Sequence, residues 1–382
     1  MAQELRECEA HGTPTRLRCA EADCGKPICP RCLVKTSVGL KCGEHAQAVA
    51  PRFDRRVTRF SLGALVLVAA AVVILAFAVF NQSSGTSPAP DDTPAPAASG
   101  DPGANARIVP ASVYVVNADG TGARTLTHRA LAFDASPAWS PDGARIAFES
   151  TFEGKRAIWV MQADGLGLRR LTDGPSSDFA PAWSPDGGRI AFMSDRDGNE
   201  EVYVIGADGS GMRRLTNNPE PDGFPAWSPD GARMAFVSAR DGQPGVWVMS
   251  PDGSNQRRLV PGPAVTARPA WSPDGRQIAF ASDRDGGNLD IFVAPAPAAP
   301  TDAGPPPTKV ITSPGLDGEP AWSPDGSKLA FASDRDGAPQ VYVANRDGSG
   351  VVRLTSKPRS FTPAWSPDGT KLVYINDPAP GS

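Results

Sequence analysis

Eight cysteine and histidine residues with metal-ligand spacing lie near the N-terminus of this 382-residue chain. Two intervening residues separate each of three pairs, namely Cys8 and His11, Cys29 and Cys32, and Cys42 and His45. Four residues separate Cys19 from Cys24. Zinc takes four nitrogen or sulfur ligands in a tetrahedron, so eight ligands complete two sites with no open position for water. We therefore predict two structural Zn²⁺ ions in residues 1–50.

Metal binding is the expected source of folding energy for this segment, because it has few large apolar side chains. The alternative is a knot of three disulfides. Disulfides would not explain why two of the three histidines in the chain stand at ligand spacing.

The segment resembles a B-box-type zinc finger, a variety found at the N-terminus of some bacterial membrane proteins. The match rests on Cys8-x2-His11, on Gly25-Lys-Pro-Ile-Cys-Pro-Arg-Cys32 and on Val38-Gly-Leu-Lys-Cys42. The resemblance implies cross-braced pairing, with Cys8, His11, Cys29 and Cys32 on one ion and Cys19, Cys24, Cys42 and His45 on the other. The spacing alone also permits a sequential pairing.

The rest of the chain contains few of the side chains and motifs on which enzyme catalysis commonly relies. A Ser-His-Asp arrangement needs a histidine base, and His128 is the one histidine beyond residue 45. No Gly-x-Ser-x-Gly motif occurs. We predict that His128 is an exposed loop residue and that the protein is not an enzyme.

Paired aspartates recur in Asp-x-Asp-Gly stretches such as Asp195–Gly198, Asp283–Gly286 and Asp334–Gly337. Clustered carboxylates could bind calcium. However, the same residues suit a hairpin turn, in which Asp accepts backbone hydrogen bonds and Gly adopts positive φ. Ala239 replaces the first Asp in one copy, and another copy reads Thr151–Gly154. We therefore expect turns rather than ion sites.

A pentapeptide, Trp-Ser-Pro-Asp-Gly, recurs through the part of the chain that carries the paired aspartates, and its spacing indicates how that part is organised. Its six copies begin 44, 44, 44, 51 and 43 residues apart, at Trp139, Trp183, Trp227, Trp271, Trp322 and Trp365. Such a period indicates a repeat architecture. Each unit predicts four short strands separated by turns; in the second unit these are residues 181–184, 189–194, 202–205 and 213–216. Four strands per repeat of this length favour an all-β propeller.

The first and last repeats are each half a unit. The chain enters at Val113-Tyr-Val, which matches a third strand, and leaves at Lys371-Leu-Val-Tyr374, which matches a second strand. Joined in space, the halves make one blade and close a ring of six, which removes exposed sheet edges. Residues 111–376 resemble the TolB-type six-bladed propeller through Pro-Ala-Trp-Ser-Pro-Asp-Gly, Ser-Asp-Arg-Asp-Gly and Arg-Arg-Leu-Thr. The resemblance implies protein–protein scaffolding.

Variable segments before each first strand are the predicted ligand contacts of the propeller, since binding usually lies on variable loops of a rigid scaffold. These segments are Ser177–Phe179, Pro221–Phe224, Leu316–Glu319 and Ser360–Phe361, which we expect at one face near the central channel. The motif tryptophans are expected in the core rather than in a ligand box. Residues 294–308, an insertion rich in Pro and Ala, account for the 51-residue spacing.

A membrane span is predicted over residues 60–80, which contain no charged side chain and suffice to cross a bilayer as a helix. A signal peptide or a buried soluble helix is the alternative. Arg52, Arg55, Arg56 and Arg59 precede the span, so the positive-inside rule places the N-terminus in the cytoplasm. Residues 81–110 are rich in Pro, Ala and Ser, a composition that predicts a disordered linker. The propeller that follows this linker is then expected outside the cytoplasm.

The charge balance excludes nucleic acid as a partner of the propeller, because the chain beyond residue 60 is acidic and phosphate binding relies on Lys and Arg. The order of segments predicts a single-pass cell-membrane protein. Its propeller would bind a protein or cell-envelope ligand outside, and its zinc finger a cytosolic protein inside. The alternatives are an extracytoplasmic propeller enzyme acting on saccharides or peptides and a transmembrane sensor.

Overall fold

The computed structural model describes residues 6–7, 14–15, 33–36, 39–42, 111–128, 132–260, 266–296, 306–357 and 359–377. The chain divides into two compact units, Met1–Ser61 and Leu62–Ser382. In the first unit β1 (Arg6–Glu7) pairs with β2 (Pro14–Thr15), and β3 (Leu33–Thr36) pairs with β4 (Gly39–Cys42). The predicted span 60–80 and linker 81–110 lie outside the described residues. Within the described residues, no helix has the length and apolar character needed to cross a membrane.

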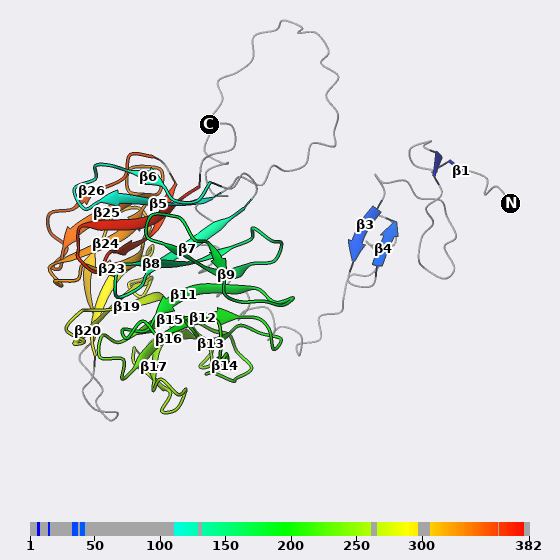
Figure 1. Ribbon diagram of the computed structural model, residues 1–382, viewed down its shortest axis with the longest axis horizontal. Helices are drawn as coiled ribbons and strands as arrows, with labels where there is room; N and C mark the ends of the chain where they lie inside the picture. The colour runs from blue at the N-terminus through cyan, green and yellow to red at the C-terminus, as the bar shows by residue number, and fades with distance from the viewer. Residues whose placement is uncertain are drawn as a thin grey trace, which may run out of the picture. The chain divides into compact units, whose positions relative to one another are not determined.

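The second unit contains six four-stranded antiparallel sheets, which are the blades of a propeller (Figure 1). Blades 1 to 5 each use four consecutive strands. Blade 1 comprises β7 (Asp134–Trp139), β8 (Arg145–Ser150), β9 (Ala157–Gln162) and β10 (Arg169–Arg170). Blade 2 comprises β11 (Asp178–Trp183), β12 (Arg189–Ser194), β13 (Glu201–Gly206) and β14 (Arg213–Arg214). Blade 3 comprises β15 (Asp222–Trp227), β16 (Met234–Ser238), β17 (Gly245–Met249) and β18 (Arg257–Arg258).

The insertion falls in blade 4, between its third and fourth strands. Blade 4 comprises β19 (Thr266–Trp271), β20 (Gln277–Ser282), β21 (Asp290–Pro295) and β22 (Thr308–Ile311), so the inserted residues separate the third and fourth strands. Blade 5 comprises β23 (Asp317–Trp322), β24 (Lys328–Ser333), β25 (Gln340–Asn345) and β26 (Val352–Arg353).

Blade 6 is assembled from both ends of the repeat region, which confirms the predicted ring closure. Its order is β27 (Ser360–Trp365), β28 (Lys371–Asn376), β5 (Ser112–Asn117) and β6 (Arg124–Thr125). Strands β28 and β5 pair from Lys371 opposite Asn117 to Asn376 opposite Ser112. Figure 1 shows the cyan strand β5 beside the red C-terminal strands.

The Trp-Ser-Pro-Asp-Gly turn is held by hydrogen bonds that need its particular side chains. In blade 2 the Ser184 hydroxyl donates to Asp186 Oδ1 at 2.5 Å and accepts from the Arg189 backbone N–H at 2.9 Å. Asp186 Oδ1 also accepts from the Gly188 N–H at 3.0 Å, and these bonds lower the pKa of the Asp186 carboxyl. Gly187 has φ +68°, a conformation that glycine adopts without steric cost. This chemistry explains why the motif recurs unchanged.

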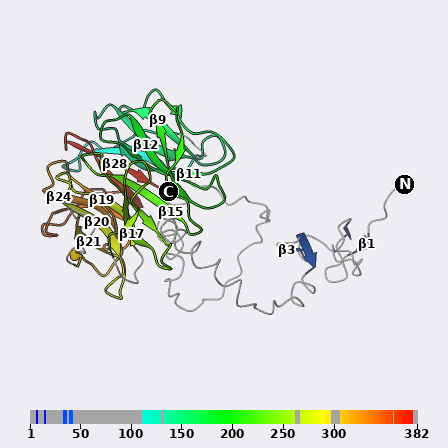
Figure 2. The ribbon, with the colours of Figure 1, turned by 90° about the horizontal axis from the view of Figure 1, so that it is seen from below.

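The hydrophobic core lies between adjacent blades. Ile158 and Val160 of blade 1 pack with Phe192 and Tyr203 of blade 2, and equivalent clusters fill other junctions. Third strands are therefore covered on both faces, which fits their runs of consecutive apolar residues. Four of the motif tryptophans, Trp183, Trp227, Trp271 and Trp322, are buried in this core as predicted. Figure 2 shows the blades following one another around the ring, from green through yellow to orange.

The first strands begin earlier than predicted, which corrects the assignment of the four variable segments to loops. Asp178, Asp222, Asp317 and Ser360 each open a first strand, and all four side chains are buried. Two features obscured these strands in the sequence. Each contains a proline, which cannot donate to a ladder, and each contains a bulge that interrupts the alternation of apolar residues.

Candidate binding site at the central channel

A bulge in every first strand directs one residue per blade to the central channel. In β11 the register with β12 shifts between Phe179 and Ala182, and corresponding shifts occur in the other five blades. The residue inside each bulge has positive φ, between 45° and 57°, although none is glycine. Such backbone conformations are costly for bulky side chains and are often found at functional sites. The six residues are Ser136, Ala180, Phe224, Arg268, Glu319 and Thr362.

These six residues, each followed by a proline, line a cavity of about 130 Å³. The backbone geometry is the same in all six blades, whereas the side chains include a hydroxyl, an aromatic ring, a cation and an anion. A rigid scaffold that presents different side chains at equivalent positions is suited to recognition. We call this set the channel ring.

The charged members of the channel ring are paired with each other. Arg268 Nε lies 3.4 Å from Glu319 Oε1, and Arg268 Nη2 donates to Ser136 Oγ at 3.0 Å. The Arg268 guanidinium also stacks on the Phe224 ring at 5.2 Å from its centroid. Glu319 Oε2 accepts from the Thr362 backbone N–H at 2.6 Å. These contacts connect five of the six blades across the channel.

A second buried glutamate supports the ring from blade 1. Glu149 is 3% exposed, and its Oε2 accepts from the Ala180 backbone N–H at 2.8 Å. Arg156 Nη1 lies 3.2 Å from Glu149 Oε1, and its guanidinium stacks on Phe133 and Phe179. Glu149 therefore holds the bulge of blade 2 in the way that Glu319 holds the bulge of blade 6.

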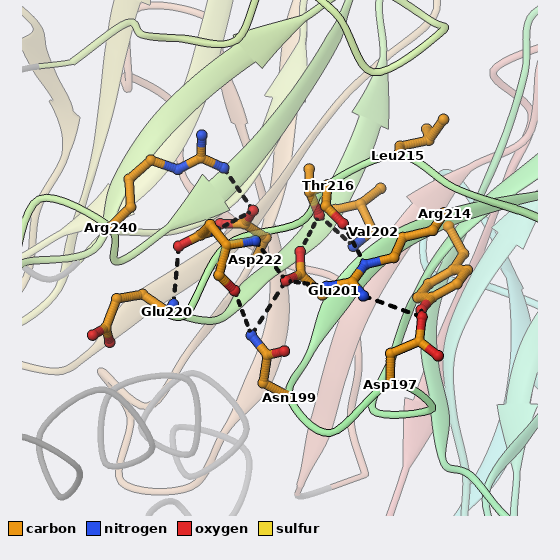
Figure 3. A network of polar contacts seen from close by, with 12 residues as sticks. Asp197, Asn199, Glu201, Val202, Arg214, Leu215, Thr216, Glu220, Asp222 and Arg240 are labelled. Carbon is orange, nitrogen blue, oxygen red and sulfur yellow. Dashed lines mark hydrogen bonds and ion pairs between the residues drawn. The ribbon is translucent and has the colours of Figure 1, made fainter.

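A buried polar network connects blades 2 and 3 (Figure 3). Glu201 and Asp222 are both fully buried, and Figure 3 shows Arg214 beside the first and Arg240 beside the second. Arg214 Nη2 donates to Glu201 Oε1 at 2.8 Å, and Arg240 Nη2 donates to Asp222 Oδ2 at 2.6 Å. Asn218 bridges the two carboxylates through its backbone N–H and its Nδ2. The burial outweighs the Ser238 and Arg240 contacts and raises the pKa of Asp222 to about 6.

We expect the stability of the propeller to rise as the pH falls from 7 to 5. The pKa of Asp222 is raised in the folded state, so the folded state binds a proton that the unfolded chain, with a pKa near 3.8, does not. The gain is on the order of 1–2 kcal/mol. Asp334, whose pKa burial also raises, acts in the same direction. The urea midpoint, followed by tryptophan fluorescence, measures the effect. Asp222→Asn should reduce this pH dependence, and an unchanged slope in the variant would contradict the assignment.

The predicted zinc ligands fall almost wholly outside the described residues. Cys42 ends β4, where its backbone pairs with Leu33. Cys8, His11, Cys19, Cys24, Cys29, Cys32 and His45 lie outside the described residues. Among the residues that the structure describes, no group of three or more His, Cys, Asp or Glu side chains could hold a metal ion.

His128 and the aspartate turns lie where they were predicted. His128 is exposed after β6. Asp195 Oδ1 accepts from the Ser177 backbone N–H at 2.7 Å, and Asp334 Oδ1 accepts from the Leu316 N–H at 2.6 Å. Gly198 has φ +107°. These carboxylates therefore tie each hairpin to the start of the first strand.

Sequence reasoning missed Glu149 and most of the channel ring, although Phe224 and Glu319 belong to segments predicted near the channel. Aligning the six repeats offered one signal, because the residue before Pro-Ala-Trp differs in every copy. Glu149 stands where the other blades have Met193, Val237, Ala281, Ala332 and Ile375, so it was also an exception within an apolar strand.

The six four-stranded sheets, closed into a ring around the channel, define a six-bladed β-propeller. The sequence profile of the TolB beta propeller domain, PD40, matches residues 107–223, 169–263, 217–301 and 262–380. The chain belongs to the TolB β-propeller family.

Solved structures agree with this family at the level of the fold. A TolB-type protein of Agrobacterium tumefaciens is 24% identical, with a TM-score of 0.61 over 70% of this chain and 98% of that one. TolB of Acinetobacter baumannii is 24% identical, with a TM-score of 0.58 over 68% of this chain and 67% of that one.

A relative found by sequence matches only a short stretch. The Tol-Pal system protein TolB of Syntrophus aciditrophicus is 48% identical over 48 residues, which span 13% of this chain and 11% of that relative.

Proposed function

We propose that the propeller binds a protein or cell-envelope ligand at the channel ring and acts as a scaffold rather than an enzyme. The observation that carries this proposal is the set of six strained, equivalent positions with different side chains around one cavity. The scaffold is rigid and the side chains vary, which is the arrangement expected of a recognition surface. The names of the relatives, which place TolB in the Tol-Pal system, support a role in a protein assembly.

Photo-crosslinking from the channel tests this proposal. A photoreactive residue in place of Thr362, which lies in the channel ring, should give a discrete adduct with one envelope component in intact cells. The matched control places the same residue at Thr121, an exposed position in the turn between β5 and β6. Equal adducts at both positions, or none at Thr362, would count against a ligand at the channel.

We further propose that the chain is anchored by residues 60–80, with two structural Zn²⁺ ions in a cytoplasmic finger and the propeller outside. The uncharged span, the four preceding arginines and the spacing of the cysteines and histidines support this arrangement. The finger would bind a cytosolic protein.

Zinc content and topology are measured together on the full chain. We expect about two zinc ions per chain and external protease cleavage within the linker or propeller but not the finger. Chelation at pH 7 should unfold the finger, because metal binding supplies its folding energy. A zinc-free chain with oxidised cysteines, or a finger cleaved from outside, would contradict this part of the proposal.

A further inference from the structure

One arginine of blade 4 lacks the carboxylate that its counterparts bind. The arginine of the Ser-x-Arg-Asp-Gly hairpin is Arg196 in blade 2, Arg240 in blade 3, Arg335 in blade 5 and Arg284 in blade 4. The first three each donate Nη2 to the aspartate that opens the first strand of the same blade, at 2.9, 2.6 and 2.8 Å. Each also donates Nε to the serine two residues before it, at 2.8 to 2.9 Å.

Arg284 occupies the same place in its blade but makes neither bond. Its guanidinium stacks on Phe280 and Phe292, both 5.1 Å from the ring centroid. Arg335 stacks on the equivalent rings at 5.1 and 5.0 Å, so the two side chains take the same course. Thr266 is the residue that opens β19, where the other three blades have aspartate.

The polar atoms around Arg284 show what is missing. In the described part of the chain, Arg284 Nε is buried without a hydrogen-bond partner. Ser282 Oγ, on a fully buried residue, likewise has none, whereas Ser194, Ser238 and Ser333 accept from their arginines. A half-buried cation without a paired anion is unfavourable, and the burial lowers the pKa of Arg284.

The neighbouring charges do not replace the lost carboxylate. Asp283 and Asp285 flank Arg284, but aspartates flank Arg196 and Arg335 in the same way. Lys309 Nζ forms ion pairs with Asp285 Oδ2 at 2.9 Å and with Asp290 Oδ2 at 2.8 Å. Arg258 lies close enough to disfavour the charge on Arg284. Blade 4 therefore lacks the first-strand carboxylate that binds the equivalent arginine in blades 2, 3 and 5.

We propose that Arg284 receives a carboxylate in trans, from an aspartate or glutamate side chain of the protein that the propeller binds. The partner chemistry follows from the three blades in which an aspartate fills this role within the chain. The location also fits, because Thr266 is two residues before Arg268 of the channel ring. The identity of the donor as a protein rests on the proposed function, whereas the carboxylate site itself does not.

The first test uses acetate as the probe and the full chain as the protein. The Nε–H resonance of Arg284, assigned with Arg284→Gln, should shift on titration with acetate at constant ionic strength. Arg335, which already holds Asp317, is the internal control and should not shift. Thr266→Asp restores the aspartate of the other blades and should weaken acetate binding about tenfold or more, since a charge-assisted hydrogen bond is replaced within the chain. Failure of Arg284 to respond, or equal responses at Arg284 and Arg335, would overturn the site.

The second test separates the site from the proposed function. One outcome is that acetate binds Arg284 while Thr266→Asp leaves the Thr362 crosslink unchanged. The carboxylate would then come from a free acid, and the proposal that the partner protein supplies it would be overturned. Loss of the crosslink in Thr266→Asp and in Arg284→Gln supports it. Should Thr266→Asp fail to fold by circular dichroism, Arg284→Lys, which keeps the charge but loses the planar fork, is expected to weaken acetate binding instead.

Discussion

A chain that ends after Arg359 should fail to form a stable propeller. It would lack β27 and β28, which are the two inner strands of blade 6. Strand β5 would lose β28, with which it pairs along its whole length, and would keep only its short pairing with β6. Leu372, Val373, Tyr374 and Ile375 are at most 1% exposed. Burial of four such side chains contributes about 2 kcal/mol each, which is comparable with the whole net stability of many domains. The open ring would also expose a strand edge prone to aggregation.

The truncated chain is best compared with one that ends after Asp377, which keeps β28 intact. Circular dichroism and urea unfolding should show a cooperative transition for the longer chain and none for the shorter. A cooperative transition of similar midpoint in both chains would show that five blades are stable without closure.

The repeat motif made the fold predictable because each of its residues has a local task. Ser184 and Asp186 bond within their own turn, and Gly187 supplies the positive φ. Such information lies within a few residues, so six copies define six turns and their spacing defines the blades. The two half-repeats then implied the closing blade.

The beginning of each first strand was not predictable in the same way. Asp178 is buried because Arg196, 18 residues later, pairs with it at 2.9 Å. From the sequence alone an aspartate is expected in an exposed loop, because the distant arginine that pairs with it in the folded chain is not known. The channel ring shows the same limit, since Arg268 reaches Ser136 from 132 positions away. Contacts of this kind arise from the closure of the ring, not from any local pattern.

Arg268→Leu should lower the free energy of unfolding by about 3–5 kcal/mol, because it leaves a buried carboxylate without its cation. Glu319 is 8% exposed and would keep only its bond from the Thr362 N–H. The double variant Arg268→Leu, Glu319→Gln should recover most of this loss, since no buried charge remains and glutamine can still accept from Thr362. Urea unfolding of the full chain measures both variants.

The matched control is Arg353→Leu at the exposed pair of Arg353 and Asp336, which are 3.9 Å apart with side chains about half exposed. An exposed pair contributes little, so this change should cost less than about 1 kcal/mol. If Arg268→Leu cost no more than Arg353→Leu, the Arg268–Glu319 pair would be solvated in practice. The channel would then be open to water at this point, and the two charges would be available to a ligand without first being separated.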